Sequence, residues 1–126
     1  MVEKEELALG RLSSSEKAAV RAFLKALNNR FPEQLVSVIL FGSKARGNSR
    51  TGSDVDVLVI LRQEGWQLTN AISTLAARIS YEHDVLLGPI IIGQERWERM
   101  RRAQFSLYRN VAREGLVLQK TSALPI

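Results

Sequence analysis

Two aspartates, Asp54 and Asp56, stand at the start of an apolar run, Val57 to Leu61, and indicate metal chemistry. Side chains alternate between the two faces of a strand, so both carboxylates of this Asp-x-Asp pattern would point to the same side. Two carboxylates held close together repel each other, and a divalent cation relieves that repulsion. Hard oxygen ligands of this kind suit Mg²⁺ and also Mn²⁺. The spacing therefore predicts a cation site where a strand begins.

A Gly-Ser pair, Gly42-Ser43, follows an earlier apolar run that ends at Phe41. Glycine lets the backbone approach a ligand closely, and serine offers both a hydroxyl group and a backbone N–H. A short helix that begins at Ser43 would direct its first amide groups toward an anion. We therefore expect a phosphate cradle beside the cation site, a combination that suits phosphoryl or nucleotidyl transfer.

Apolar runs predict the strands that would position these groups. A polar segment, 42–53, separates the first two runs and is too long for a tight hairpin. A Gly-Pro pair, Gly88-Pro89, within the third run would mark a bulge, an edge strand or an early end of the strand. The predicted strands are Leu35–Phe41, Asp54–Leu61 and Glu82–Ile92, with a short last strand at Leu116–Leu118.

Helical periodicity predicts the elements that surround the strands. Ser13 and Glu16 have the spacing of a capping box, and Pro32 prevents the helix that follows from continuing. This order of elements predicts an α/β (α+β) fold, with residues 1–126 forming one domain. The predicted helices run from the N-cap Ser13 to about Asn28 or Asn29, from Trp66 to about Tyr81, and from Gln94 to about Arg101, with Gln104 to Arg113 also helical and open to being continuous with it.

Composition limits the classes of partner. The 18 basic and 13 acidic residues give a net charge of +5, which favours phosphate-bearing or acidic partners. Aromatic residues are few and do not interleave with the charges, which argues against nucleic acid as the main partner. The absence of cysteine excludes disulfides, thiolate zinc sites and a cysteine nucleophile, and a single histidine, His83, argues against a histidine zinc site. We expect a cytoplasmic protein with no membrane segment, because no apolar run approaches about 20 residues and the N-terminus is acidic and polar.

The segments GSKARG at 42–47 and SDVDVLV at 53–59 together resemble the signature of the minimal nucleotidyltransferases of the DNA polymerase β superfamily. The resemblance implies a DNA polymerase β-like nucleotidyltransferase core, a small mixed β-sheet flanked by helices, with the first two strands as antiparallel neighbours. It also implies a third carboxylate, Asp84, at the head of the third strand. Asp84 would join Asp54 and Asp56 as a catalytic and metal-binding residue and accept the proton of the attacking hydroxyl group. Asp84 could instead cap a turn.

The same motif implies which residues bind the nucleotide: Gly42, Ser43, Arg46 and Ser53. Arg46 could equally form a structural ion pair beneath the loop. Lys44 is a further candidate for a phosphate contact, although we expect it to lie in solvent. Six arginines in the segment 94–113 give a basic helix face. Such a face is either solvated or a docking surface for an acidic partner or a nucleotide.

The activity that the resemblance implies is Mg²⁺-dependent transfer of a nucleoside monophosphate, AMP from ATP, to a hydroxyl group of a partner protein. Small members of the family are often antitoxins that silence a helical HEPN-type ribonuclease toxin by binding it, by adding AMP to it, or both. The chain has little room for an acceptor-binding domain, so a partner would bring the acceptor or a homo-oligomer would complete the site. Two other functions stay open: a catalytically silent binding module of the same fold, and transfer to a small molecule such as an aminoglycoside, or to RNA.

Overall fold

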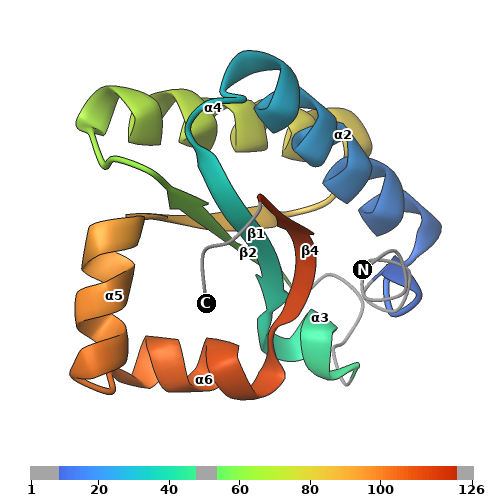
Figure 1. The fold of residues 1–126 in the computed structure, drawn as a ribbon. Helices are drawn as coiled ribbons and strands as arrows, with labels where there is room; N and C mark the ends of the chain where they lie inside the picture. The colour runs from blue at the N-terminus through green and yellow to red at the C-terminus, as the bar shows by residue number, and fades with distance from the viewer. Residues whose placement is uncertain (1–8, 48–53, 122–126) are drawn as a thin grey trace.

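The computed structural model describes residues 9–47 and 54–121, which form a mixed β-sheet with helices on both faces (Figure 1). Within these residues the strand order is β3-β2-β1-β4. β1 pairs antiparallel with both β2 and β4, and β3 pairs parallel with β2. The antiparallel pairing of the first two strands is thus confirmed. The strands are β1 Leu35–Phe41, β2 Val55–Leu61, β3 Leu87–Gly93 and β4 Leu116–Lys120.

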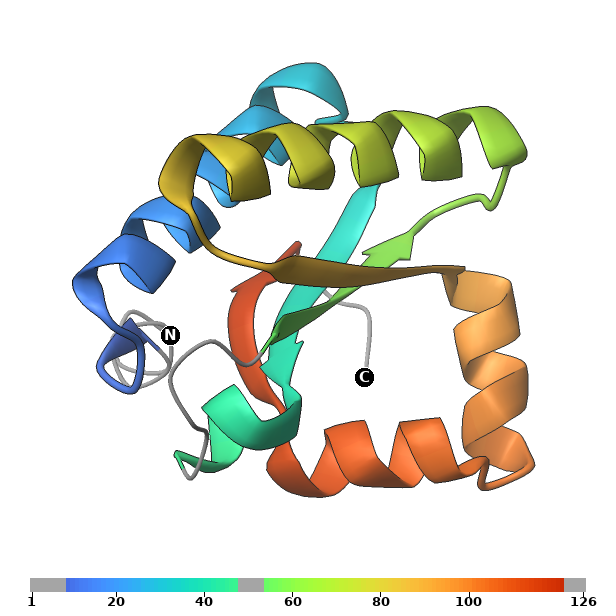
Figure 2. The ribbon, with the colours of Figure 1, turned by 180° about the vertical axis from the view of Figure 1, so that it is seen from behind.

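Helices cover both faces of this sheet, as Figures 1 and 2 show. α2 and α4 pack on one face over an apolar cluster that includes Phe23, Val57 and Ile72. α5 and α6 pack on the other face over a second cluster that includes Leu58 and Trp97. A five-residue helix, α3, follows β1 directly. The helices are α2 Ser14–Arg30, α3 Gly42–Arg46, α4 Trp66–His83, α5 Gln94–Arg102 and α6 Ser106–Glu114.

The capping box at the start of α2 is confirmed. The N–H of Glu16 donates to the Ser13 hydroxyl group at 3.2 Å, and the N–H of Ser13 donates to the Glu16 carboxylate at 2.8 Å. Two amides that the helix itself leaves unpaired are satisfied in this way. α2 ends at Arg30, one or two residues beyond the predicted end and still before Pro32.

The third strand begins later than the sequence pattern predicts. α4 continues through residue 83, and Asp84 is its C-cap in the left-handed conformation, with φ 53° and ψ 45°. The residues after α4 are hydrogen-bonded to Ser80. Val85 N–H donates to the Ser80 carbonyl oxygen, and Leu87 N–H donates to the Ser80 hydroxyl oxygen. Aspartate tolerates the left-handed region better than most residues, so it can end the helix here. The prediction that Asp84 stands at the head of a strand is therefore wrong.

The arginine-rich segment 94–113 forms two helices rather than one. Gln104, with φ 54°, breaks the helical path between α5 and α6, and Phe105 N–H donates to the Met100 carbonyl oxygen at 3.0 Å. The last strand, β4, is two residues longer than predicted because it continues its pairing along β1. Among the helices of the described residues, none is long and apolar enough to cross a membrane.

Candidate active site

Asp54 and Asp56 lie where β2 begins, on the face of the sheet that α5 and α6 cover. Asp56 alternates with Val55 and Val57, which pack into the α2 and α4 cluster, and it has the same orientation as Leu58, which packs into the opposite cluster. Asp54 is exposed and Asp56 is half-buried. Burial raises the pKa of the Asp56 carboxyl group, the negative charge of Asp54 raises it further, and Arg46 lowers it in part. The two carboxylates form an acidic pair in which ionisation of one disfavours ionisation of the other.

Gly42 lies directly against Asp56. Phe41, the residue before Gly42, is paired with Asp56 in the antiparallel register of β1 and β2. The chain then turns into α3, and Gly42 has a φ of 76°. A Cβ atom at Gly42 would lie 2.3 Å from Asp56 Oδ2, closer than two atoms can approach. Glycine is thus required by both backbone conformation and space. The structure thus places Gly42 of the predicted Gly-Ser turn against Asp56, and the next residue, Ser43, is half-buried in α3.

Gly88 faces the same pair from the other neighbouring strand. β3 pairs Gly88 with Asp56, and a Cβ atom at Gly88 would lie 3.4 Å from Asp56 Oδ1 and 3.9 Å from Asp54 Oδ2. A side chain at this position would point at both carboxylates. Of the three alternatives that the Gly-Pro pair left open, the edge strand is confirmed, because β3 is at one edge of the sheet. The sequence pattern did not place Gly88 beside the site.

The structure does not bring Asp84 to this arrangement. Asp84 is exposed at the end of α4, four residues before the strand position that faces the pair. In the described part of the chain, no three histidine, cysteine, aspartate or glutamate side chains form a group that could hold a metal ion. Ser53, the remaining predicted site residue, lies outside the described residues.

Lys44, the third residue of the GSKARG motif, is buried rather than solvated. Its ammonium group forms an ion pair with the Glu16 carboxylate at 2.5 Å, and the two side chains are only 5% and 13% exposed. Burial opposes the ionised form of Glu16, but hydrogen bonds from Lys44 and from the Ser13 backbone outweigh it, and the pKa of Glu16 is lowered. The expectation of a solvent-exposed Lys44 is wrong, because the sequence alone does not show that the start of α2 packs against α3.

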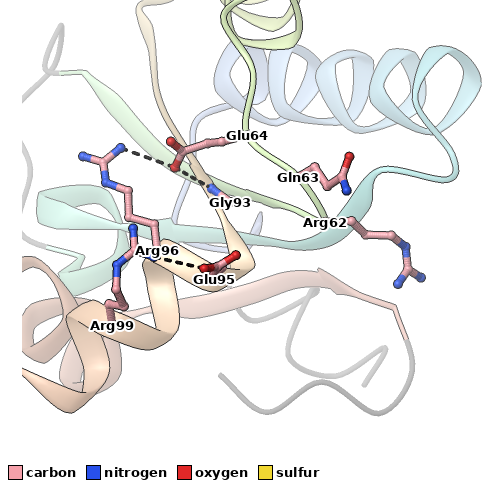
Figure 3. A pocket seen from close by; sticks show the side chains of 7 residues that line it. All are labelled: Arg62, Gln63, Glu64, Gly93, Glu95, Arg96 and Arg99. Carbon is pink, nitrogen blue, oxygen red and sulfur yellow. Dashed lines mark hydrogen bonds and ion pairs between the residues drawn. The ribbon is translucent and has the colours of Figure 1, made fainter.

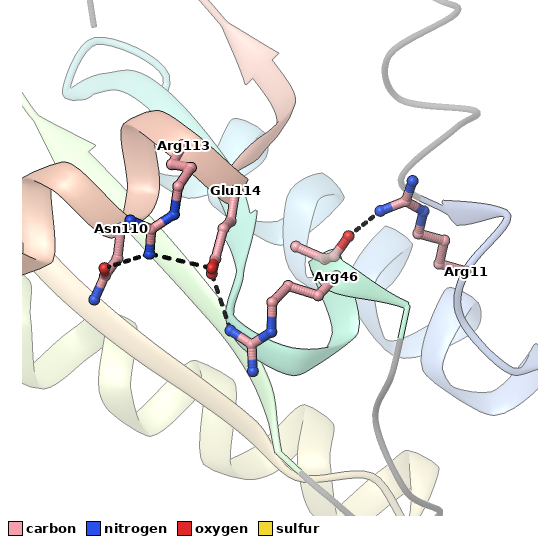
Figure 4. Close-up of polar contacts among 6 residues, drawn as sticks. Arg11, Arg46, Asn110, Arg113 and Glu114 are labelled. Carbon is pink, nitrogen blue, oxygen red and sulfur yellow. Dashed lines mark hydrogen bonds and ion pairs between the residues drawn. The ribbon is translucent and has the colours of Figure 1, made fainter.

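Two further contacts hold α3 in place (Figure 4). The Arg46 guanidinium group donates to the Glu114 carboxylate at 2.9 Å, and Arg113 contacts the same carboxylate at 3.3 Å. These arginines hold the pKa of Glu114 below its usual value. On the other side of α3, Arg11 donates to the Ala45 carbonyl oxygen. Arg46 thus forms the ion pair that the sequence left as one of its two alternatives, while it still lies close enough to Asp56 to lower that pKa.

The residues at this site fit a hard divalent cation. Asp54 and Asp56 offer oxygen ligands, which Mg²⁺ and Mn²⁺ prefer. Burial and mutual repulsion disfavour the doubly ionised pair, so a bound positive charge would be stabilising here. Gly42 leaves backbone rather than a side chain beside these oxygens. The arrangement can therefore hold a cation together with a phosphate-bearing ligand.

A separate hollow of about 420 Å³ lies at the opposite end of β2 and β3 (Figure 3). Arginine and glutamate side chains from the turn after β2 and from α5 line it. Gly93 N–H donates to the Glu64 carboxylate at 2.8 Å, and Arg96 contacts the same oxygen at 3.3 Å. Glu64 thereby attaches the start of α5 to the turn after β2, which is a structural role.

Solved structures share this fold. A crystal structure of a toxin–antitoxin with AMP-PNP superposes with a TM-score of 0.60 at 22% sequence identity, covering 81% of this chain and 73% of that chain. A crystal structure of the toxin–antitoxin MntA-HepT superposes with a TM-score of 0.54 at 20% identity, covering 83% and 73%.

Sequence relatives extend the similarity. Two proteins of Methanocaldococcus jannaschii, each named a putative protein adenylyltransferase, are similar to this chain. The first is 29% identical over 104 residues, covering 82% of this chain and 98% of the relative. The second is 37% identical over 73 residues, covering 57% and 74%. Residues 20–107, which contain α3, the acidic pair and β3, match the nucleotidyltransferase domain family. The chain therefore belongs to the nucleotidyltransferase domain family.

Proposed function

We propose that this nucleotidyltransferase moves AMP from ATP to a hydroxyl group of a partner protein in a Mg²⁺-dependent reaction. The observation that carries the proposal is the acidic pair, Asp54 and Asp56, of which Asp56 packs against Gly42 at the end of β1. The names of the two archaeal relatives, which both specify protein adenylyltransferase, support AMP as the transferred group and protein as the acceptor.

Asp54 and Asp56 would hold the Mg²⁺ ion, or Mn²⁺ in its place. A divalent cation held there would neutralise charge on the phosphates and polarise a phosphoryl oxygen. The backbone of Gly42 and Ser43 would bind the triphosphate, and Ser53 is predicted to assist. Arg46, held by Glu114, would add positive charge at the phosphates.

The reaction is a displacement at the α-phosphorus of ATP. The acceptor oxygen forms a bond to that phosphorus, the bond to the oxygen that bridges to the β-phosphate breaks, and pyrophosphate leaves with that electron pair. The acceptor hydroxyl group loses its proton to solvent. Asp84 does not share the arrangement of the acidic pair, so the role of proton acceptor implied for it has no support from its position.

We propose a helical HEPN-type toxin as the partner protein. The support is the likeness of fold to the toxin–antitoxin structures, one of which contains AMP-PNP and another of which is MntA-HepT. The chain would then act as the antitoxin, and the acceptor hydroxyl group would belong to the toxin.

A binding module without chemistry is the second candidate. The observation that favours it is the bare position Gly88, because the two carboxylates receive no third carboxylate from β3. In this case the chain would neutralise its partner by docking alone, and the acidic pair would not be needed for neutralisation.

Label transfer distinguishes these candidates. The protein is incubated with Mg²⁺, ATP labelled at the α-phosphate and an extract of its own cells, alongside Asp54→Asn and the control Glu33→Gln. Glu33 is an exposed carboxylate at the other end of β1 and should not affect the site. We expect a labelled protein band with the wild type and with Glu33→Gln, and none with Asp54→Asn. A band that persists in Asp54→Asn would refute the assigned site, and the absence of both a band and Mg²⁺-dependent ATP binding would refute the transferase proposal.

A further inference from the structure

The α5–α6 corner, residues 102–109, carries an exposed phenylalanine where α5 turns into α6 (Figure 1). Phe105 is 54% exposed. It is also the N-cap of α6, where Ser, Thr, Asp or Asn would bind the first free N–H groups of the helix, and its side chain makes no such bond. The local preferences of a helix start therefore give no reason for a phenylalanine here.

The backbone fixes the position of this phenylalanine. Phe105 N–H donates to the Met100 carbonyl oxygen at 3.0 Å, and Gln104 N–H donates to a carbonyl oxygen of the last turn of α5 at 3.1 Å. With Gln104 in the left-handed region at φ 54°, this is the Schellman arrangement that ends many helices. An apolar residue in the place of Phe105 often packs on the last helical turn. More than half of Phe105 stays exposed, so such packing accounts for only part of its surface.

Two arginines beside Phe105 have no carboxylate partner. Arg102 is the last residue of α5, and Arg109, one turn into α6, donates its N–H to the Phe105 carbonyl oxygen at 3.0 Å. Both arginines are exposed, and neither forms an ion pair within the described residues, whereas each of the other four arginines of α5 and α6 contacts a glutamate. Glu98 is bound by Arg101, which lowers its pKa more than Arg102 does.

We propose that the α5–α6 corner docks on an acidic partner protein, with Phe105 in an apolar pocket and Arg102 and Arg109 against carboxylates at the rim of that pocket. This inference rests on the proposed function, because the docked partner is the protein that offers the acceptor hydroxyl group. Aromatic and arginine side chains carry much of the binding energy of protein interfaces. Positive charges without an internal partner are complementary to carboxylates on another molecule. A turn that is already fixed lowers the cost of ordering on binding.

Single-stranded nucleic acid also binds aromatic and arginine side chains, but it stacks successive bases on several rings. The other exposed aromatic residues of the described chain are Trp66 and Tyr81, and both are on α4, which packs on the opposite face of the sheet. Tyr108 is half-buried, and its ring centroid lies 5.3 Å from that of Trp97. The corner therefore offers a single ring, which suits a pocket in a protein.

The corner lies within reach of the active site. α6 runs from the corner to α3, as Figure 2 shows, and its last residue, Glu114, binds Arg46. Nine helical residues span about 13 Å. An interface of ordinary size, about 800 Å² on each partner, covers that distance. A protein docked at the corner can therefore extend along α6 and present a hydroxyl group to the site.

Photo-crosslinking in an extract of the protein's own cells tests this surface. The full-length protein carries p-benzoyl-phenylalanine in place of Phe105, and the matched control carries it in place of Trp66, which is 72% exposed on α4. Each protein is illuminated with and without nuclease, and again with Arg102→Gln and Arg109→Gln added. Circular dichroism establishes that each variant is folded.

We expect position 105, and not position 66, to crosslink to a protein of the same mass as the AMP-labelled band, with or without nuclease. The two glutamines should raise the amount of extract needed for half-maximal crosslinking by about fivefold or more, because each rim charge contributes modestly. In label transfer, Phe105→Ala should raise that amount by about 30-fold, the loss that marks a binding hot spot. Trp66→Ala should change neither result, and both variants should retain Mg²⁺-dependent ATP binding.

Three results would overturn the docking surface: no crosslink at position 105, equal crosslinking at 105 and 66, or a crosslink that nuclease removes. A crosslink unchanged by the two glutamines would overturn the acidic partner. None of these results bears on the transfer reaction, which labelling by the wild type decides. An arginine-dependent crosslink at position 105 to a protein that is never labelled would support the docking surface and favour the binding module over the transferase.

Discussion

The nearly buried ion pair between Lys44 and Glu16 joins α3 to the start of α2. Glu16→Gln removes the negative charge, and the new glutamine side chain can still form the capping box. Removal of one partner from a fully buried pair costs about 3–5 kcal/mol. Because Glu16 retains 13% exposure and solvent relieves part of that cost, we expect a loss of about 1–3 kcal/mol in the free energy of unfolding.

Lys44→Met is the matched variant, because methionine keeps much of the side-chain volume and removes the charge. Glu16 would keep its hydrogen bond from the Ser13 backbone and its partial exposure, so this variant should lose less than Glu16→Gln. The double variant should resemble Lys44→Met alone, since Lys44→Met already removes the positive charge with which Glu16 is paired. The difference between the sum of the single losses and the double loss gives the coupling energy of the pair.

The contribution of Glu16 to the free energy of unfolding depends on pH. The pKa of Glu16 is lowered in the folded state, despite the opposing effect of burial, because Lys44 and Ser13 donate to its carboxylate. Its contribution to stability is therefore complete above the unfolded pKa and is lost as pH falls through the folded pKa. Urea unfolding followed by circular dichroism should show a gap between wild type and Glu16→Gln at pH 7 that narrows below about pH 4. Equal stability at pH 7, or an equal gap at pH 7 and at pH 3, would refute the ion pair as the source.

Three other predictions follow from the site and its surroundings. The raised pKa of Asp56 reflects burial first and Asp54 second, so its stabilising contribution is lost as pH rises through the folded pKa. Asp56→Asn should therefore melt about 1–3 °C higher than the wild type in metal-free buffer at pH 7, and a lower melting temperature would contradict this. Gly42→Ala should cost about 2–4 kcal/mol in chemical unfolding and abolish Mg²⁺-dependent ATP binding, whereas Gly65→Ser, with no atom within 4 Å of the new Cβ, should leave both unchanged; normal ATP binding by Gly42→Ala would argue against the cradle. Gly115→Ala should lose about 1–3 kcal/mol, because the new Cβ would lie 2.5 Å from the Val111 carbonyl oxygen and 2.9 Å from a methyl group of β1, and unchanged stability would show that the end of α6 yields easily.

Local sequence signals predicted the elements that depend on local forces. The bounds of β1 are as predicted, because its apolar run is flanked by a proline turn and a Gly-Ser turn. Ser13 and Glu16 predicted the start of α2 because a capping box is formed by residues close in sequence. The alternation of Asp54 and Asp56 with Val55 and Val57 placed both carboxylates on one face for the same reason.

Features that depend on tertiary register could not be read in this way. The start of β3 is decided by its pairing with Val55 and by the exit of the chain past Ser80, so Asp84 was assigned to a strand although it ends a helix. The sequence alone predicts that Lys44 is a surface residue. In the structure, Glu16 of α2 contacts α3 and pairs with Lys44. The partner of Arg46, Glu114, lies 68 residues away, and no local pattern connects the two.

The two glycines beside Asp56 explain how one half-buried carboxylate can serve a ligand from two directions. At Gly42 the backbone itself fills the space, and any side chain would collide with Asp56, so this side is fixed and suits recognition of phosphate by N–H groups. At Gly88 a small side chain would fit and none is present, so this side has room for water or for a phosphate oxygen of the nucleotide. A carboxylate between a closed side and an open side has its own position fixed while part of a cation's shell stays exchangeable. That asymmetry is what a transfer site needs, because the nucleotide must be held while an acceptor oxygen approaches.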